Sequence, residues 1–249
     1  MVILNKSSEQ KCPHGKQVSC GDCRLNSICL PLALESDDVV KLDEIVRRGR
    51  PLQKNEHLYR EKDTFNSIYA VRSGSIKAYR VTGGGQEQVT GFYFPGEIIG
   101  MDGICKNTYA NSAKALETSA VCEIPFNRLE ELSVQLPSMQ RHFFQLMSQE
   151  ITSDQQLITL LSKNSAEERI AALLLSISAR NARRKLSGTH FRLPMSRTDI
   201  GNYLGLTIET VSRVFSRFNK LGLIVVEGKE ITLLNLDEIM AIANVAILE

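Results

Sequence analysis

Long hydrophobic runs are missing from this sequence of 249 residues. No apolar stretch approaches the roughly 18 residues that a membrane-spanning helix needs, and residues 1–30 contain no basic segment followed by an apolar one. Membrane insertion and secretion are therefore not expected, and we expect a cytoplasmic protein. The sequence also contains no internal repeat and no low-complexity tract.

Signatures of common enzyme classes are missing as well. There is no glycine fingerprint of a dinucleotide-binding fold and no phosphate-binding loop. The four histidines are scattered, so no Ser–His–Asp or Cys–His constellation is evident: His14, His57, His142 and His190. We expect a protein that is not an enzyme. An electron-transfer or redox enzyme that uses the cysteines remains the alternative, and a flavin or NAD assay separates the two.

Charge is distributed unevenly along the chain. The net charge is only +2. Residues 180–229 contain ten Lys or Arg against three Asp or Glu, a net charge of +7, so the rest of the chain carries −5. A basic region of this kind attracts phosphate groups. The sequence therefore predicts two parts, of which one is suited to nucleic acid.

Residues 196–223 show the pattern of two short helices joined by a tight turn. Ser196, with Asp199 three residues later, can cap the first helix, and Gly205 can end it because glycine enters the left-handed conformation cheaply. Thr207 can cap the second helix, whose apolar positions recur at helical spacing: Ile208, Val211, Val214, Phe215 and Phe218. The pattern predicts a helix-turn-helix, whose second helix enters the DNA major groove.

The other face of this second helix carries Glu209, Ser212 and Arg213, which lie three or four residues apart. Arg213 can donate to O6 and N7 of guanine, Glu209 can accept from cytosine N4, and Ser212 can reach a base edge or a phosphate. A helical hairpin with a solvated charged face is the alternative. A β-hairpin predicted at residues 223–226 and 231–234 favours a winged helix-turn-helix, so residues 164–249 are predicted to bind double-stranded DNA.

Three of the six cysteines fall within ten residues: Cys20, Cys23 and Cys29. Without an export signal, a disulfide framework is not expected. Soft thiolates at this spacing bind zinc or iron–sulfur clusters, whereas unligated thiols in a flexible arm are the alternative. Residues 1–30 are thus predicted to be a poorly structured metal-binding arm. Its fourth ligand is left open among four candidates: Cys12, Cys105, Cys122 and a histidine such as His14.

The middle of the chain alternates short strands with glycine turns, after a short helix within residues 31–46. This pattern predicts an antiparallel barrel or roll over residues 31–136. The clearest predicted strands lie at residues 67–72, 74–81, 88–93, 113–117 and 119–124.

Residues 137–163 are predicted to form one long helix that begins with Pro137. It carries a heptad-spaced seam: Phe144, Met147, Ile151, Asp154, Ile158 and Leu161. A second stripe can pack on the helix's own domain: Phe143, Leu146, Leu157 and Leu160. Two seams favour a homodimer over the alternative of a helix buried within its domain. Asp154 would face its own copy in that dimer, at a cost on the order of 1 kcal/mol, so the dimer is expected to be marginal.

This order of parts resembles the FNR (fumarate and nitrate reduction) regulators, the oxygen-responsive branch of the CRP/FNR superfamily, over nearly the whole chain. The most specific matches are the spacing Cys20-x2-Cys23-x5-Cys29 and the motif Glu209-x-x-Ser212-Arg213. The resemblance implies an α+β fold with a jelly roll like that of cyclic-nucleotide-binding domains. It also implies a 4Fe–4S cluster held by four cysteines, with Cys12 and Cys105 spare: Cys20, Cys23, Cys29 and Cys122.

The resemblance further implies an oxygen switch. The homodimer would bind palindromes with TTGAT-type half-sites, and oxygen would break up the cluster and leave monomers that bind DNA weakly. Residues 82–88 match in position a surface loop that contacts RNA polymerase in the family. A regulator of the same fold that uses zinc or thiol redox remains the alternative.

The cyclic-nucleotide branch of the superfamily holds its ligand's phosphate with an Arg-Ser pair in the roll. In this sequence the place of the arginine aligns with Asn111, beside Ser112. A buried phosphate would then lack a counter-charge, so cyclic-nucleotide binding is not expected.

Overall fold

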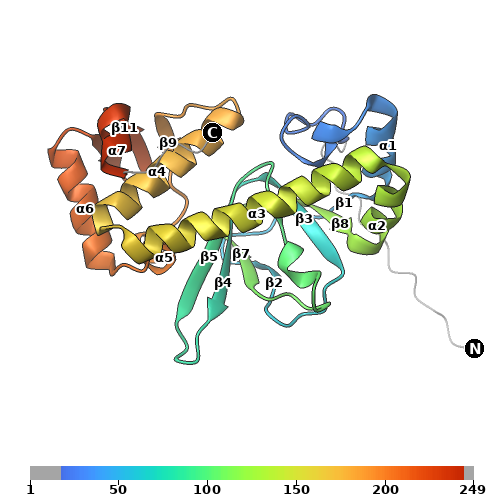
Figure 1. The fold of residues 1–249 in the computed structure, drawn as a ribbon, viewed down its shortest axis with the longest axis horizontal. Coiled ribbons are helices and arrows are strands. Elements are labelled where there is room, and N and C mark those ends of the chain that lie inside the picture. The colour runs from blue at the N-terminus through green and yellow to red at the C-terminus, as the bar shows by residue number, and fades with distance from the viewer. Residues whose placement is uncertain (1–17, 244–249) are drawn as a thin grey trace, which may run out of the picture.

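The computed structural model describes residues 18–243, which form a β-roll, a long helix and a winged helix-turn-helix in that order (Figure 1). This architecture confirms the α+β fold predicted from the sequence. Cys12 and His14, two of the candidate fourth ligands, lie outside the described residues. No helix in residues 18–243 is both long enough and apolar enough to cross a membrane.

The β-roll consists of two four-stranded antiparallel sheets with the strand orders β1-β8-β3-β6 and β2-β7-β4-β5. The five predicted strands are confirmed as β3, β4, β5, β7 and β8. Strands β1, β2 and β6 were not predicted, because two or three residues are too few to show an alternating pattern. The strands are β1 Arg47–Arg48, β2 His57–Tyr59, β3 Ser67–Ser73, β4 Ile76–Val81, β5 Glu87–Tyr93, β6 Ile98–Ile99, β7 Ser112–Ala115 and β8 Ala120–Pro125.

Short helices cover one end of the roll: η1 (Leu30–Ala33), α1 (Ser36–Ile45) and α2 (Phe126–Gln135), while η2 (Met101–Gly103) follows β6. Helix α2 was not predicted. Its buried side chains, Leu129 and Leu132, are three residues apart. Two apolar positions are too few to distinguish a helix from the end of a strand by their spacing. The chain leaves the helical conformation at Leu136 before α3 begins at Pro137.

The expectation of a poorly structured arm is wrong for residues 18–30. These residues form a series of turns that ends in η1, and Leu25 and Leu30 are only 6% and 2% exposed. Leu30 belongs to the same hydrophobic core as Leu42 of α1, Leu136 and Met139 at the start of α3. The cysteine-bearing segment therefore folds against the roll and the long helix, because Leu30 supplies an apolar anchor that the polar composition around it conceals.

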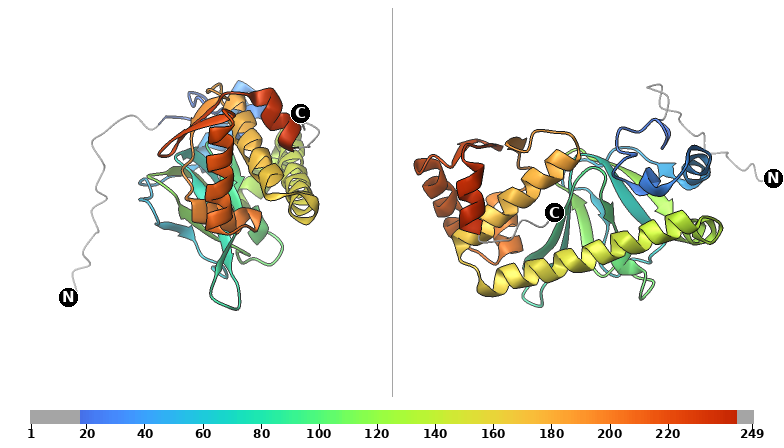
Figure 2. Two further views of the ribbon diagram at one scale, coloured as in Figure 1. Left: turned by 90° about the vertical axis from the view of Figure 1, so that its left-hand side faces the viewer. Right: turned by 45° about the horizontal axis from the view of Figure 1, so that its top comes forward.

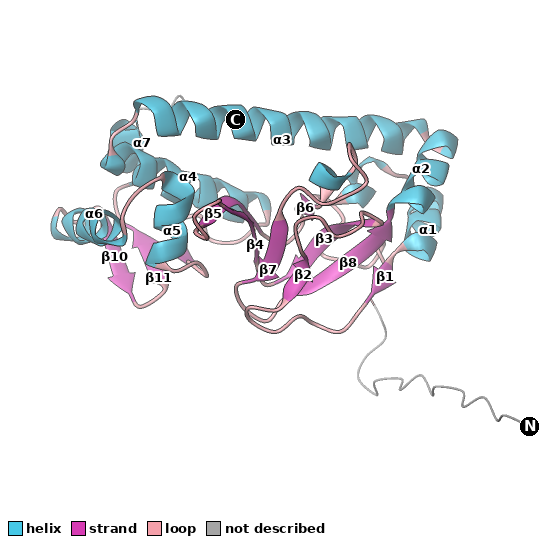
Figure 3. Ribbon diagram, turned by 90° about the horizontal axis from the view of Figure 1, so that it is seen from below, coloured by secondary structure: helices cyan, strands magenta, loops and turns pink. Residues whose placement is uncertain are grey.

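Helix α3 (Pro137–Lys163) is 27 residues long, or about 40 Å at 1.5 Å per residue. It lies along the roll and extends from α2 to the winged helix-turn-helix (Figures 2 and 3). Phe143 and Leu146 pack on the core of the roll, and Leu160 packs on the core of the next domain. This helix therefore connects the cysteine end of the molecule mechanically to its C-terminal domain.

The C-terminal domain combines four helices with the three-stranded sheet β10-β11-β9. A complete capping box starts α4 at Ser165, a second starts α5 at Ser196, and Thr207 caps α6. Gly205 ends α5 with φ +64°, the left-handed conformation that the sequence predicted. The elements are α4 Ala166–Arg183, β9 His190–Arg192, α5 Arg197–Leu204, α6 Ile208–Lys220, β10 Ile224–Glu227, β11 Glu230–Leu233 and α7 Leu236–Ala243.

Leu30→Ala is expected to destabilise the protein by about 2–5 kcal/mol, because it removes a buried side chain and leaves a cavity. Leu32→Ala, in the same 3-10 helix, is the matched control. Leu32 is 56% exposed, so its substitution should change stability by less than about 0.5 kcal/mol. Urea unfolding of both variants measures the difference. Equal midpoints would show that the segment is not anchored through Leu30.

Candidate metal site and DNA interface

Four cysteines line one cavity of about 40 Å³ at the end of the roll: Cys20, Cys23, Cys29 and Cys122. The first three lie in the turns before η1, and Cys29 is the residue immediately preceding that helix. The fourth lies on β8. We call this space the cysteine cavity. The structure thus brings together the four residues that the resemblance implied, whereas Cys105 is exposed and is not among the lining residues.

Two arginines that sequence reasoning missed, Arg48 and Arg72, also line the cysteine cavity. Arg48 Nη2 lies 3.4 Å from Cys20 Sγ and 2.5 Å from Asp43 Oδ1. Asp43 Oδ1 in turn accepts from the backbone N–H of Cys20 at 2.7 Å. Arg48 Nε is buried and has no hydrogen-bond partner among the described residues. A guanidinium held beside thiols in this way favours an anionic occupant.

Burial is the largest influence on the pKa of three cavity thiols, those of Cys20, Cys29 and Cys122. Burial, together with the hydrogen bond to Asp43, raises the pKa of Cys20 to about 12, although Arg48 opposes the shift. Burial likewise raises the pKa of Cys29 to about 12. It also raises the pKa of Cys122, although Arg48 and Arg72 oppose the shift. These thiols are therefore protonated at neutral pH without a ligand, and thiolate ligation must displace their protons.

The donor set of the cysteine cavity fits an iron–sulfur cluster. Soft thiolates are the usual ligands of such clusters, which take four cysteines. Within residues 18–243, no group of three or more His, Cys, Asp or Glu side chains is arranged to hold a metal ion. Each thiolate of a four-iron cluster binds a different iron, so four thiols that line one cavity need not converge on a single point to hold such a cluster.

The exposed face of α6 carries the three residues predicted to contact bases. Glu209, Ser212 and Arg213 are all exposed, whereas the opposite face is buried in the domain core through Val211, Val214, Phe215 and Phe218. Ile208 was expected to face inward but is 44% exposed, because it occupies the first turn of α6.

Arg213 is free to reach a ligand. Its Nη2 makes one hydrogen bond, to Thr210 Oγ1 at 3.3 Å, and it forms no ion pair with the described residues. Arg217, by contrast, is bound to Glu167 of α4 at 2.6 Å. The base contacts of Glu209, Ser212 and Arg213 stay predictions, but their side chains are available for them.

The predicted dimer seam is largely uncovered in the single chain. Phe144, Ile151 and Ile158 are 57%, 59% and 66% exposed, and Asp154 is exposed between the last two. Met147 and Leu161 are half-buried. Partial burial raises the pKa of Asp154. A row of large apolar side chains along one helix face marks a surface that another protein chain can cover.

Comparisons with known proteins agree with this architecture. A model of the cyclic nucleotide-binding domain matches residues 49–135, and a model of the Crp-like helix-turn-helix domain matches residues 168–242. The transcriptional activator protein anr of Pseudomonas aeruginosa is 55% identical over 228 residues, which cover 92% of this chain and 93% of the relative. The chain belongs to the FNR regulators of the CRP/FNR family.

Other relatives support the same assignment. The fumarate and nitrate reduction regulatory protein of Salmonella typhimurium is 46% identical over 230 residues, or 92% of each chain. The solved structure of FixK2 from Bradyrhizobium japonicum superposes with a TM-score of 0.75 at 27% identity and covers 81% of this chain and 99% of that one. As a member of this family, the protein is a DNA-binding transcription regulator and not an enzyme.

Arg213→Ala is expected to weaken binding to a palindrome of TTGAT-type half-sites by about 1–3 kcal/mol per half-site, because it would remove the predicted bidentate contact with guanine. Binding at fixed salt measures the effect. The exposed Arg128 of α2, which pairs with Glu131, supplies the control variant Arg128→Ala, which should bind as the wild type does. If Arg213→Ala lost equal affinity on DNA that lacks the guanine, Arg213 would be a phosphate contact instead.

Proposed function

We propose that this protein is an oxygen-responsive regulator whose cysteine cavity holds a 4Fe–4S cluster through Cys20, Cys23, Cys29 and Cys122. The observation that carries the proposal is that four thiols, from two distant parts of the chain, line one cavity together with two arginines. The arginines supply positive charge to a centre that four thiolates make negative. When bound, the cluster would supply reactivity toward dioxygen.

The cysteine segment has a direct mechanical route to the proposed dimer helix. Cys29 is the N-cap residue of η1, and η1 contacts α3. Within that contact, Leu30 packs in one core with Leu136 and Met139. Ligation would therefore fix η1 against the first turns of α3, and loss of ligation would release it. Cys122 on β8 provides the fixed side of this connection because it lies within the roll sheet.

The exposed seam of α3 supports a homodimer. Two copies packed along this seam would remove Phe144, Ile151 and Ile158 from water, while the paired Asp154 carboxylates would repel each other. Such a dimer would be only marginally stable, so a small free-energy change at the start of α3 could shift the equilibrium between monomer and dimer. A complete shift between monomer and dimer needs a differential stabilisation of about 5.5 kcal/mol.

Dimerisation would place two α6 helices about 34 Å apart, one turn of DNA, on a palindromic site with TTGAT-type half-sites. Monomers would lose most of the specific affinity, since each would contact one half-site. The protein would act in the cytoplasm, in contact with the genome, as an activator or repressor of anaerobic genes. The relative from Haemophilus influenzae, 46% identical over 230 residues, is named an anaerobic regulatory protein.

The hairpin between β4 and β5 is suited to a contact with RNA polymerase. Its tip, residues 82–86, is exposed, and the hairpin projects from the body of the roll (Figure 1). A hydrogen bond from the N–H of Thr82 to Gln86 O, at 2.9 Å, closes the turn. Support for this partner comes from the resemblance and from the exposure of the tip.

The interior of the roll is unsuited to a cyclic nucleotide. Asn111, at the expected arginine position, donates from its backbone and side chain to Asp102 Oδ2, at 2.9 and 2.7 Å. That carboxylate would repel a phosphate. Glu97, beside the turn at Gly96, faces Arg180 of α4 at 3.5 Å and is thereby engaged with the C-terminal domain. We therefore propose that the roll does not sense a cyclic nucleotide.

Replacing any of the four cavity cysteines by serine is expected to abolish most bound iron and acid-labile sulfide in protein purified without air, because each thiolate ligates one iron. Cys105→Ser is the matched control and should keep both, together with the broad visible absorption band of the wild type. Admission of air should bleach that band.

Three results would contradict the proposal. Colourless wild-type protein that contains zinc would indicate the same-fold regulator with a zinc site. A band that is indifferent to air would remove the oxygen response. Loss of iron in Cys105→Ser, with retention in Cys122→Ser, would show that the fourth ligand is wrongly assigned.

A further inference from the structure

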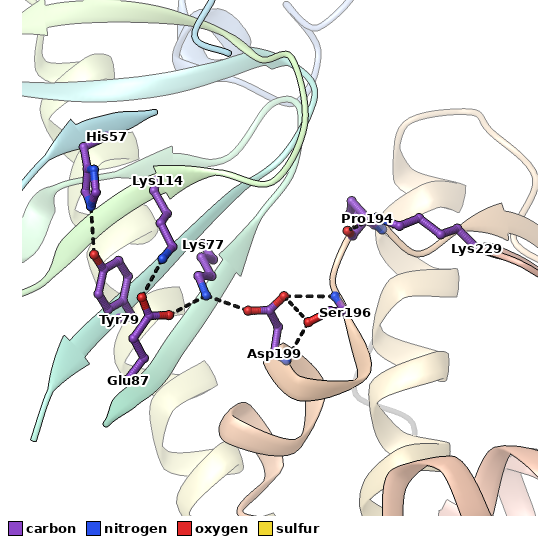
Figure 4. Close-up of polar contacts among 9 residues, drawn as sticks. All are labelled: His57, Lys77, Tyr79, Glu87, Lys114, Pro194, Ser196, Asp199 and Lys229. Atoms are coloured by element: carbon purple, nitrogen blue, oxygen red, sulfur yellow. Dashed lines mark hydrogen bonds and ion pairs between the residues drawn. The ribbon is translucent and has the colours of Figure 1, made fainter. Parts of the chain in front are cut away.

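A buried lysine connects the roll to the helix-turn-helix (Figure 4). Lys77 on β4 is only 4% exposed. Its Nζ donates to Glu87 Oε2 on β5 at 2.7 Å and to Asp199 Oδ1 on α5 at 2.5 Å. Glu87 is shared with Lys114 of β7, whose Nζ lies 2.5 Å from Oε1. Two lysines and two carboxylates thus form one compact network across the domain boundary.

Asp199 has two tasks in this network. Its Oδ2 accepts from the backbone N–H and the hydroxyl of Ser196, at 2.9 and 2.6 Å, and so completes the capping box of α5. Its Oδ1 binds Lys77. The same carboxylate therefore fixes the first turn of the helix-turn-helix and attaches that turn to the roll. A rotation of α5 away from the roll would break the contact with Lys77.

Three further contacts join the roll to the C-terminal domain. Gln88 Nε2 of β5 donates to the backbone oxygen of Asn202 on α5. The rings of Phe92 and Tyr203 meet at 5.1 Å between centroids. Arg192 of β9 pairs with Glu117 of the roll at 2.5 Å. Because β5 and α5 share one hydrophobic core, the helix-turn-helix is docked on the roll of its own chain.

The charge on Lys77 depends on this docking. Burial alone would lower the pKa of Lys77, but its hydrogen bonds to Asp199 and Glu87 outweigh burial and raise it. Without Asp199, the remaining carboxylate beside the buried ammonium would be that of Glu87, which is already shared with Lys114. A buried charge that loses a partner is strongly unfavourable, so such pairs select one arrangement of the groups around them.

We propose that Lys77 is a positioning residue for DNA binding: it fixes the orientation of the helix-turn-helix on the roll, and so sets the separation of the two recognition helices in the dimer. Because α3 also packs on the roll, the roll acts as the rigid reference between the dimer seam and α6. The proposal rests on the dimer proposed above. It predicts that Lys77 governs which spacing of half-sites the protein accepts, without contacting DNA.

The experiment compares Lys77→Met, Lys77→Arg and Lys114→Met, all prepared without air. Lys114→Met is the matched control, since it removes a partner of Glu87 without touching the C-terminal domain. Affinity is measured at fixed salt on a single half-site and on palindromes whose half-site spacing is native, one base pair shorter or one base pair longer. The wild type should prefer the native spacing.

Lys77→Met is expected to reduce the preference for native spacing about tenfold while leaving half-site affinity unchanged. Lys77→Arg should recover part of the preference, and Lys114→Met should keep it. Retention of the full preference in Lys77→Met would overturn the proposal. So would an equal loss of affinity on all four duplexes, because that pattern indicates a damaged helix-turn-helix.

Hydrogen exchange on the protein in air separates this proposal from the proposed dimer and cluster. Peptides that cover β5 and α5 should exchange faster in Lys77→Met than in the wild type or Lys114→Met, whether or not the protein dimerises. Unchanged exchange would overturn the role of Lys77. If Lys77→Met exchanges faster but the wild type shows no preference for half-site spacing, the result would count against the proposed dimer and not against the role of Lys77.

Discussion

The packing of Leu30 in the core of the roll is the contact that connects the cysteine cavity to helix α3. It places Cys29 at the start of η1 and η1 against the first turns of α3. Without this apolar anchor, three thiols on a polar segment would have no fixed relation to Cys122 or to the long helix. With it, a change of ligation in the cysteine cavity would act on the helix that carries the proposed dimer seam.

In the proposed mechanism, two further constraints would convert that local change into a change in DNA binding. The seam of α3 is apolar but contains Asp154, so the proposed association along it would be favourable but weak. The helix-turn-helix is docked on the roll through Lys77 and Asp199, so α6 follows the roll whenever α3 pairs with another copy. With these connections, the proposed ligation, dimerisation and alignment of the recognition helices would be coupled equilibria.

Local signals made much of the fold predictable. The capping residues Ser196 and Thr207, the left-handed Gly205 and the periodicity of α6 are each defined by neighbours within four residues. The spacing of three cysteines was also enough to predict that their thiols lie close together: Cys20, Cys23 and Cys29. It did not identify Arg48, which approaches Cys20 across 28 residues, or the contact of Lys77 with Asp199 across 122 residues. Such pairings depend on how the roll closes, and no short pattern encodes them.

Sedimentation velocity, recorded simultaneously in the ultraviolet and in the visible band of the cluster, shows whether occupancy of the cysteine cavity controls dimerisation. The sample is protein purified without air and then exposed to a limiting amount of oxygen. The coloured protein is expected to sediment as a dimer and the colourless protein as a monomer. Colour shared equally between the two species would show that the occupancy of the cysteine cavity does not control association.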